Sequence, residues 1–411
     1  MVNSRLSGFH KRSVAERIAE VTSQCALTPE EAQALESGGI SLEAADKMVE
    51  NVVGTFRIPV GLATNFHING KDYLIPMATE EPSVVAAASN AAKMIREGGG
   101  FRTSSTDPIM IGQIQVVKAK RGSEKRIVKG KKSLLKYANS LDPMLVKFGG
   151  GAHDIKVRKV KDMLIVHLHV NVADAMGANA VNTMCERLAP RIEEMTGGQV
   201  ILKILTNYAV ERTAKATALI PKEQVGGEEY VDRIIWAYKL AAYDVYRAVT
   251  HNKGIMNGVT AVVLATGNDT RAVEAGCHSF AVKKGRYTSL TIWKKNKSGD
   301  IVGEIEIPVA VGLVGGATRT HPTAKANVKI LGVKTARELG EVLAAVGLAQ
   351  NFAAIRALAS EGIQRGHMRL HARNIAVTAG AEGKNADRVA EEMVKLGKVN
   401  VDEAKRILEG M

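Results

Sequence analysis

The sequence predicts an α+β protein with a discontinuous, mainly helical large domain, an inserted domain of β-α-β-β-α-β order, and a small helical C-terminal flap. Three observations lead to this prediction. Strand-type and helix-type hydrophobic periodicities alternate in that order over residues 109–205. Helix-start signals and Ala-rich helical segments lie on both sides of this region, and helical patterning dominates from Thr335 onward. The 411 residues are 45% hydrophobic, which excludes wholesale disorder and is ample for a large core.

The inserted domain has the clearest pattern. From Leu164 to Val172 apolar residues alternate with more polar ones, as in a strand with one buried face. The predicted elements are, in order, strand 109–117, helix 124–138, strand 154–160, strand 163–172, helix 175–194 and strand 199–205. This order is that of a ferredoxin-like domain, so we expect a four-stranded antiparallel sheet with both helices on one face.

The flanking segments predict helices and one hairpin. Thr28 and Glu31 form a capping-box pattern, and Pro82 opens an Ala-rich helix over 83–96 whose small residues predict a central, buried position. Further capping boxes are expected at Thr335–Glu338 and at Asn400–Glu403. A hairpin is expected between strands 286–295 and 301–309. The expected domains are a large domain of residues 1–107 and 213–365, an inserted domain at 108–212, and a flap at 366–411.

The net charge of +14 is concentrated in the inserted domain, where 14 Lys and Arg residues stand against three acidic ones between Lys118 and Lys161. Such a segment could attract nucleic acid, or a phosphate-rich small molecule such as a dinucleotide or coenzyme A (CoA). A solvated charged surface without a ligand is the plain alternative. Only Tyr137 and Phe148 could stack on bases in this segment, which speaks against a nucleic-acid-binding protein.

Several other classes of protein are also disfavoured. No stretch reaches the roughly 18 apolar residues of a membrane-spanning helix, and the N-terminal residues lack the apolar run of a signal peptide, so we expect a cytoplasmic protein. Neither a G-x-G-x-x-G nor a P-loop motif is present, and the three cysteines lie far apart. His367 and His371 have the spacing of zinc ligands, but Met368 stands where a zinc protease needs glutamate. No metal is therefore expected.

Short polar segments interrupt the apolar, Gly- and Ala-rich sequence. They are ENVVG at 50–54, EEPS at 80–83, DAMGAN at 174–179, HNKG at 251–254, TGND at 266–269 and GHM at 366–368. At Glu81, Lys253, Asp269 and His367 they offer two carboxylates, an ammonium and an imidazole. These groups suit an acid–base site that handles a developing oxyanion.

Together these segments resemble the class II, soluble family of 3-hydroxy-3-methylglutaryl-coenzyme A (HMG-CoA) reductases. The matching stretches, in the order of that family, are ENVVGTF, TEEPSVVAAAS, DAMGANAVNTM, THNKGIMNG, ATGNDTRAVEAG, VGLVGGAT, GLAQNFAA and GIQRGHMRLHARN. The resemblance extends from Ser4 to the end of the chain. The cofactor domain of that family is ferredoxin-like rather than Rossmann, which accounts for a dinucleotide enzyme without G-x-G-x-x-G.

The resemblance implies reduction of HMG-CoA to mevalonate and CoA by two NAD(P)H, through a mevaldyl-CoA hemithioacetal and mevaldehyde. By resemblance, Lys253 stabilises the oxyanion of each hydride transfer, Glu81 donates protons, and Asp269 links the two by hydrogen bonds. Glu81 should then be protonated near neutral pH, which requires a buried side chain. His367 matches the histidine that protonates the departing thiolate, a transfer that suits an imidazolium.

The resemblance also implies binding residues. Those for the substrate are Ser83, Arg247, Thr250 and Asn257, with Glu50, Asn51 and His371 as further residues of that site. Those for the cofactor are Asp142, Asp174, Met176, Gly177, Asn179 and Thr183. Asp142 lies where members that prefer NADH carry an aspartate, because a carboxylate accepts from a ribose 2′-hydroxyl and repels a 2′-phosphate. We therefore expect NADH to be favoured, with NADPH accommodated by the nearby Lys136 and Lys147.

The expected partners are HMG-CoA, mevalonate, CoA and a second copy of the chain. In the family, the active site of the homodimer is shared between its subunits. The resemblance does not decide between a dimer and a higher oligomer. A family arginine that contacts CoA is replaced by His10, beside Lys11. No nucleic acid, membrane or metal partner is expected. Two alternatives remain at this stage, namely the same fold run oxidatively in mevalonate breakdown and a basic nucleic-acid-binding protein.

Overall fold

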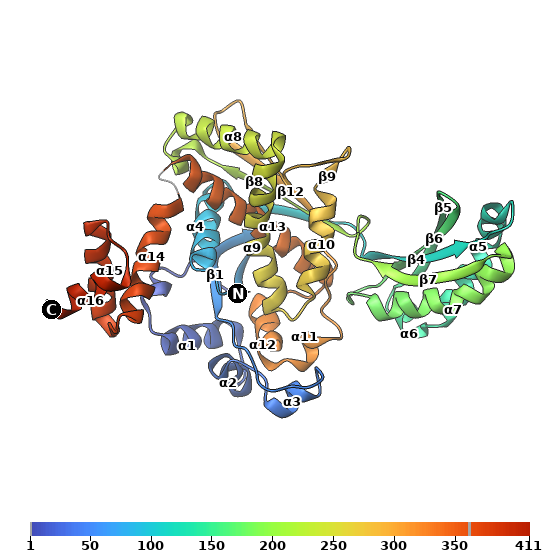
Figure 1. The fold of residues 1–411 in the computed structure, drawn as a ribbon, viewed down its shortest axis with the longest axis horizontal. Coiled ribbons are helices and arrows are strands. Elements are labelled where there is room, and N and C mark those ends of the chain that lie inside the picture. The colour runs from blue at the N-terminus through green and yellow to red at the C-terminus, as the bar shows by residue number, and fades with distance from the viewer. Residues whose placement is uncertain (1, 361–362) are drawn as a thin grey trace.

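Two separate β-sheets organise the chain, as Figure 1 shows. The structure is a computed structural model that describes residues 2–360 and 363–411, apart from the side chains of 317, 319, 363–370 and 384. The larger sheet has six strands, in the order β11 (Thr291–Lys295), β12 (Ile301–Pro308), β8 (Thr213–Ile220), β3 (Phe101–Ser105), β1 (Val60–Ile68) and β2 (Lys71–Ala78). All neighbouring pairs in it are antiparallel except β1 and β3.

The helices of the main body surround this sheet and the long helix α13 (Ala336–Ala359). The other helices of the body are α1 (Val14–Cys25), α2 (Pro29–Ser37), α3 (Leu42–Asp46), α4 (Val84–Glu97), α8 (Glu228–Tyr243), α9 (Val245–Ala265), α10 (Thr270–Phe280), α11 (Ala317–Thr320) and α12 (Pro322–Leu331). Two short 3₁₀ turns lie at Phe9–Lys11 and Lys222–Val225. One apolar cluster joins α4, α9 and α13 to the sheet. The expected burial of the Ala-rich helix is confirmed at Ala88, Ala91 and Ala92, whereas Ala86 is exposed.

By length and composition α13 could cross a membrane, yet 67% of its most apolar window is buried inside the protein. That is the environment of a core helix.

The chain leaves the large sheet after β3 and returns to it at β8, and these two strands pair with each other. Between them lie β4 (Ile109–Val117), α5 (Ser123–Ser140), α6 (Pro143–Lys147), β5 (Gly151–Val160), β6 (Met163–Asn171), α7 (Ala178–Thr196) and β7 (Gln199–Thr206). The strand order is β5-β6-β4-β7, with every pair antiparallel, and the two long helices share one core with the sheet. The predicted ferredoxin-like arrangement is confirmed, and it projects from the main body in Figure 1.

Two expected elements differ from the structure. Helix α7 begins at Ala178 rather than 175. The backbone carbonyl of Asp174 accepts from the N–H groups of Leu313 and Val314, so it is not available for the first turn of a helix. The expected strand 286–295 is interrupted, and only β11 pairs with β12. Residues 286–287 form β10, which pairs with β9 (Val282–Lys283). The backbone between the two strands bonds to Asn252 of α9, which breaks the ladder.

The capping predictions are partly confirmed. Thr28 and Glu31 form the full reciprocal box at the start of α2. Thr335 and Asn400 cap their helices. However, the glutamates three residues later bond elsewhere, Glu338 to the N–H of Lys334 and Glu403 to Arg406.

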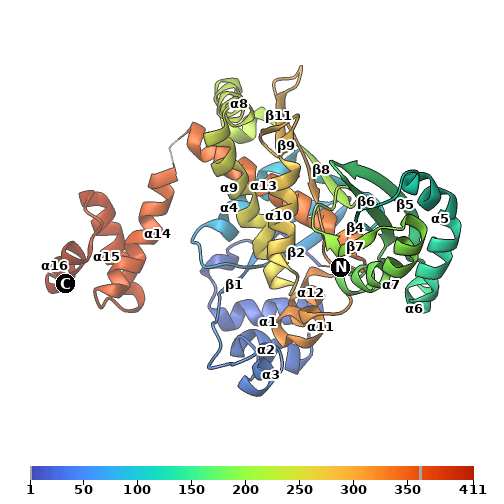
Figure 2. The same cartoon turned by 45° about the vertical axis from the view of Figure 1, so that its right-hand side comes forward.

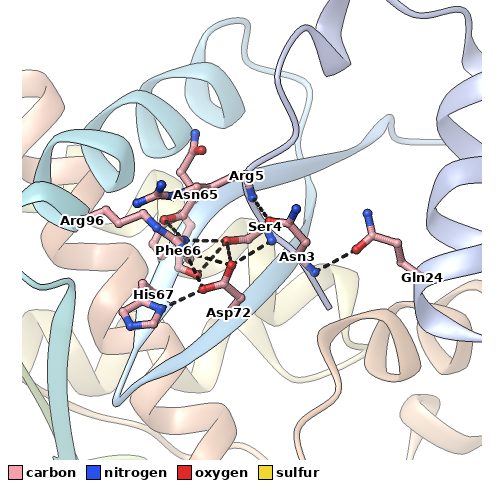
Figure 3. Close-up of polar contacts among 9 residues, drawn as sticks. All are labelled: Asn3, Ser4, Arg5, Gln24, Asn65, Phe66, His67, Asp72 and Arg96. Atoms are coloured by element: carbon pink, nitrogen blue, oxygen red, sulfur yellow. Dashed lines mark hydrogen bonds and ion pairs between the residues drawn. The ribbon is translucent and has the colours of Figure 1, made fainter. Parts of the chain in front are cut away.

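The N-terminal segment is tied to the large sheet by a buried polar network, shown in Figure 3. Ser4 donates through its hydroxyl to the Phe66 carbonyl and to Asp72, and Arg96 contacts both carboxylate oxygens of Asp72 at 2.8 and 3.0 Å. Burial opposes ionisation of Asp72, but the bonds from Arg96, His67 and Ser4 outweigh it and hold the pKa of that carboxyl far below its usual range. The network anchors the chain just before α1.

The C-terminal helices form a small unit with its own apolar core. They are α14 (Ile363–Thr378), α15 (Gly383–Leu396) and α16 (Val401–Glu409), and both views show them standing apart from the main body (Figures 1 and 2). The expected flap boundary at Gly366 falls within α14.

Candidate active site

Three side chains form a polar cluster between α9 and the turn that precedes α4. Lys253 places its Nζ 2.8 Å from Oε2 of Glu81, and Asn257 donates to Oε1 of the same carboxylate at 3.1 Å. Lys253 and Asn257 lie one turn apart on α9, so they present neighbouring groups to one carboxylate. The Lys253 side chain is 60% exposed, which leaves its ammonium accessible to a ligand.

The burial that a protonated Glu81 requires is not present in the single chain. Its side chain is 36% exposed, and both of its carboxylate oxygens accept hydrogen bonds.

Behind this cluster, α9 is anchored by a buried network that sequence reasoning missed. His251 is 2% exposed, and its Nε2 lies 2.9 Å from both Ser289 Oγ and Thr291 Oγ1. Burial lowers the pKa of His251 to about 3, with a smaller contribution from the charge of Arg247. Asn252 bonds the backbone of Thr288 and Leu290. The His-Asn pair directly before Lys253 was the available signal, because polar residues on the buried side of a helix need partners.

The other expected substrate residues are only partly gathered here. Ser83 occupies the N-cap position of α4 in a left-handed conformation (φ 73°), without a capping bond from its side chain, two residues from Glu81. Arg247 and Thr250 lie on the first turns of α9. Glu50, Asn51 and His371 are exposed, and within the described residues none of them has a hydrogen bond to the cluster. The side chain of His367 lies outside the described residues.

A cleft of about 750 Å³ lies where the inserted domain meets the main body. Among its lining residues are five of the six expected cofactor residues, Asp142, Met176, Gly177, Asn179 and Thr183. The sixth, Asp174, is not a lining residue, and its Oδ1 accepts from the N–H of Ala336 at 2.7 Å. Residues 267–269, Gly312 and residues 314–316 of the main body also line the cleft.

The chemistry of this cleft fits a dinucleotide. Helix α7 starts at the cleft without any side chain capping its N-terminus, so its first N–H groups suit a phosphate. Gly177 has φ 99°, and a Cβ there would lie 2.4 Å from Val172 Cγ1. Asp142 caps α6 by accepting from the N–H of Leu145 at 2.9 Å, which orients its carboxylate in the lining.

Asp269 lines this cleft and is separated from Lys253. It caps α10 by accepting from the N–H groups of Arg271 and Ala272. Lys253 precedes the end of α9 at Ala265 by 12 residues, or about 18 Å of helix rise. The expected hydrogen-bonded link between Asp269, Lys253 and Glu81 is therefore not formed within one chain.

A second cavity of about 680 Å³ lies between α1, β1, the end of α9 and α12. Its walls are largely apolar, and Arg17, Arg57 and His321 supply the basic groups of the lining. Asn327, which is 1% exposed, also lines it, and its Oδ1 has no hydrogen-bond partner in the described structure. His10 is exposed and follows Phe9, another lining residue. Among the residues that the structure describes, no group of three or more His, Cys, Asp or Glu side chains could hold a metal ion.

The fold and these sites suit an oxidoreductase, with a polar cluster in the main body and a cleft where a ferredoxin-like insertion meets that body. Residues 13–372 match the family model described as hydroxymethylglutaryl-coenzyme A reductase. An HMG-CoA reductase from Archaeoglobus fulgidus is 56% identical over 99% of this chain and 95% of its own length. A relative from Borreliella burgdorferi is 41% identical over 80% of this chain and 77% of its own.

Solved structures agree. The HMG-CoA reductase of Streptococcus pneumoniae superimposes with a TM-score of 0.84 at 41% identity, covering 98% of this chain and 99% of that one. A class II structure from the same organism, 42% identical and covering 86% of this chain and 99% of that one, is described as bound to NADPH in open conformations. The chain belongs to the HMG-CoA reductase family.

Proposed function

We propose that the protein reduces HMG-CoA to mevalonate and CoA with two NAD(P)H. The observation that carries the proposal is the Lys253–Glu81–Asn257 cluster, in a chain of this family. Purified protein should oxidise NADH or NADPH when given HMG-CoA, consuming two cofactors per mevalonate. No oxidation of either cofactor would overturn the proposal. The comparisons give no support to nucleic-acid binding or to an oxidative direction, and a cytoplasmic location stays a prediction.

The residues of the cluster suit both reduction steps. A bound nicotinamide cofactor supplies the hydrides. Lys253 meets the negative charge that develops on the carbonyl oxygen, a contribution typically worth about 3–4 kcal/mol of barrier. Glu81 delivers protons to the same oxygen once the site is covered, and His367 protonates the thiolate that leaves. The helical flap of residues 366–411 is proposed to close over bound substrates and exclude water.

For the cofactor, we propose that the cleft beside α7 binds its pyrophosphate and that Asp142 faces the adenosine ribose. The uncapped helix N-terminus supports the first assignment. The position of Asp142 in the lining supports the second, together with a preference for NADH. Asp174 does not line the cleft, and its proposed role is to hold the turn before α7 through its bond to Ala336.

We also propose that a homodimer completes the site. Asp269 belongs to the cofactor cleft, whereas Lys253, which bonds Glu81, precedes the end of α9 by about 18 Å of helix rise. A second copy that presents its cofactor cleft to this cluster would bring the carboxylate to the ammonium and bury Glu81. This arrangement also restores the hydrogen-bonded link that the single chain lacks.

A further inference from the structure

Arg212 is a buried cation with no role in the site described so far. It is 3% exposed and immediately precedes β8, where the chain re-enters the main body. Its Nη1 donates to the carbonyls of Ala175 at 3.1 Å and Met176 at 3.2 Å, and its Nη2 donates to the carbonyl of Val311. Burial lowers the pKa of Arg212 to about 10, although the charge of Asp174 opposes the shift.

The guanidinium has no carboxylate ion-pair partner among the described residues. A buried charge without such a partner is costly, so these carbonyl bonds must offset the cost of removing it from water. All three carbonyls belong to two loops that are far apart in sequence, 174–177 before α7 and 311–316 before α11. Arg212 therefore joins the inserted domain to the main body at one point.

Both loops line the cofactor cleft, and Arg212 does not. Because a trans peptide is planar, its C=O and N–H point in opposite directions. The carbonyls of Ala175 and Met176 turn toward Arg212, so the N–H groups of Met176 and Gly177 turn away from it. The guanidinium thus sets the orientation of the last peptide units before α7.

Neighbouring contacts also hold the 311–316 loop next to the 174–177 turn. The N–H of Gly312 donates to Asn268 Oδ1 at 2.8 Å, and Ala175 forms an isolated bridge with Val314. A Cβ on Gly312 would lie 2.4 Å from the nitrogen of Met176, so the two loops are in close contact. A change at Arg212 is expected to alter this contact before it alters the distant Lys253 cluster.

We propose that Arg212 is a positioning residue for the cofactor, which fixes the 174–177 turn against the 311–316 loop so that the peptide groups before α7 accept the dinucleotide. The proposal rests on the cofactor cleft assigned under the proposed function. It predicts a selective loss of cofactor affinity, since Arg212 bonds the loops of the cofactor cleft and makes no hydrogen bond to the Lys253–Glu81–Asn257 cluster.

The test compares Arg212→Met and Arg212→Lys with Arg96→Met. Arg96 is also a largely buried arginine, but it holds Asp72 in the N-terminal network shown in Figure 3, and neither residue lines the cleft. NADH and NADPH are each titrated by cofactor fluorescence, and KM is measured separately for cofactor and for HMG-CoA. We expect Arg212→Met to raise the Kd and KM of the cofactor at least about tenfold, with the KM for HMG-CoA changed less than twofold.

Arg212→Lys should lie between wild type and Arg212→Met, because an ammonium cannot reproduce the planar fork that bridges three carbonyls. Arg96→Met should lower the Tm but leave the cofactor Kd unchanged. Cofactor affinity within twofold of wild type in Arg212→Met, or equal rises in both KM values, would overturn the inference. If Arg212→Met does not fold, the cofactor affinity and the two KM values of Arg212→Lys are judged by the same twofold limit. Failure of the wild type to bind either cofactor would instead refute the proposed function.

Discussion

At the scale of single residues, the proposed site centres on the ammonium of Lys253, which the proposal assigns to both Glu81 and the substrate carbonyl. Lys253 is bonded to Glu81 in the free chain, and Asn257 occupies the other carboxylate oxygen. A substrate carbonyl must therefore compete with Glu81 for the ammonium. We expect Asn257 to hold Glu81 in place during that exchange, because it bonds the oxygen that Lys253 does not use.

The roles of Lys253 and His367 can be separated by choice of substrate. Lys253→Ala should reduce kcat for both HMG-CoA and free mevaldehyde by about 10²–10³-fold or more, because both reductions build an oxyanion. His367→Gln should impair HMG-CoA reduction and largely spare mevaldehyde, which has no thiolate to expel. Steady-state kinetics with the two substrates check this. Equal losses for both substrates in His367→Gln would contradict its assignment.

His251 predicts how stability depends on pH. Its folded pKa of about 3 lies below the ordinary histidine value of 6.5, so protons favour the unfolded chain. Its contribution is complete above pH 6.5 and falls as the pH drops toward 3, by up to about 1.4 kcal/mol per pH unit. Urea unfolding of wild type and His251→Gln from pH 7.5 to 4.5 should show the stability advantage of the wild type shrinking with acid. An advantage that stays constant over this range would refute the prediction.

At the scale of elements, the sequence predicted those whose signals are local. Strand β4 agrees with its prediction at both ends, because its Ile- and Val-rich composition is visible in the residues themselves. Helix α6 was missed although Asp142 and Pro143 form a cap signal, because its five residues carry no periodicity. The starts of α7 and β11 depend on bonds to Leu313 and Asn252, remote in sequence, which no local pattern contains.

Asp142 has two functions that substitution can separate, since it caps α6 and lines the cofactor cleft. Asp142→Asn keeps a cap of similar strength and removes the charge, whereas Asp142→Ala loses both. A 2′-phosphate about 4 Å from the carboxylate meets repulsion of about 4 kcal/mol per unit charge at an effective dielectric of 20, and exposed lysines rarely recover more than about 1 kcal/mol each. The wild type should therefore prefer NADH in kcat/KM, and both variants should shift toward NADPH. A wild-type preference for NADPH, or no shift in Asp142→Asn, would show that this carboxylate does not read the ribose.

The cavity between α1, β1 and α12 predicts where CoA lies. Leu264, in its lining, follows Lys253 on α9 by 11 residues, or about 16 Å of helix rise, so a CoA arm can span from the cluster to the cavity. Arg17→Ala and Arg57→Ala should raise the KM for HMG-CoA about five- to tenfold through lost phosphate contacts. The KM for mevaldehyde, which lacks CoA, should not change. If only His10→Ala raised the KM for HMG-CoA, the CoA phosphate would lie at the N-terminal segment instead.

At the scale of the whole molecule, the candidate site divides between two parts of one chain. The motifs predict which residues belong to the site, but not whether one chain or two supply them. Glu81 and Lys253 meet because the turn after β2 faces the middle of α9. Asp269 follows the end of the same helix, and no sequence signal reveals that α9 separates the two groups by three turns.

A homodimer with a shared site predicts complementation between inactive variants. Lys253→Ala and Asp269→Asn subunits are co-expressed with different affinity tags, and hetero-oligomers are isolated through both tags. If Lys253 of one subunit works with Asp269 of the other, each heterodimer keeps one complete site and should show about half of wild-type activity, by the symmetry of a two-fold dimer. Each parent homodimer should be inactive.

The matched control pairs Lys253→Ala with Glu81→Gln. These two residues come from the same chain, 2.8 Å apart, so every site of that heterodimer lacks one of them and should remain inactive. Activity in the first pair together with none in the control places Asp269 and Lys253 of each site on different subunits. If the first pair is inactive while both variants assemble into dimers, the site is complete within one chain, and α9 and α10 must then rearrange to close it. Equal recovery in both pairs would indicate a contaminating activity rather than a shared site.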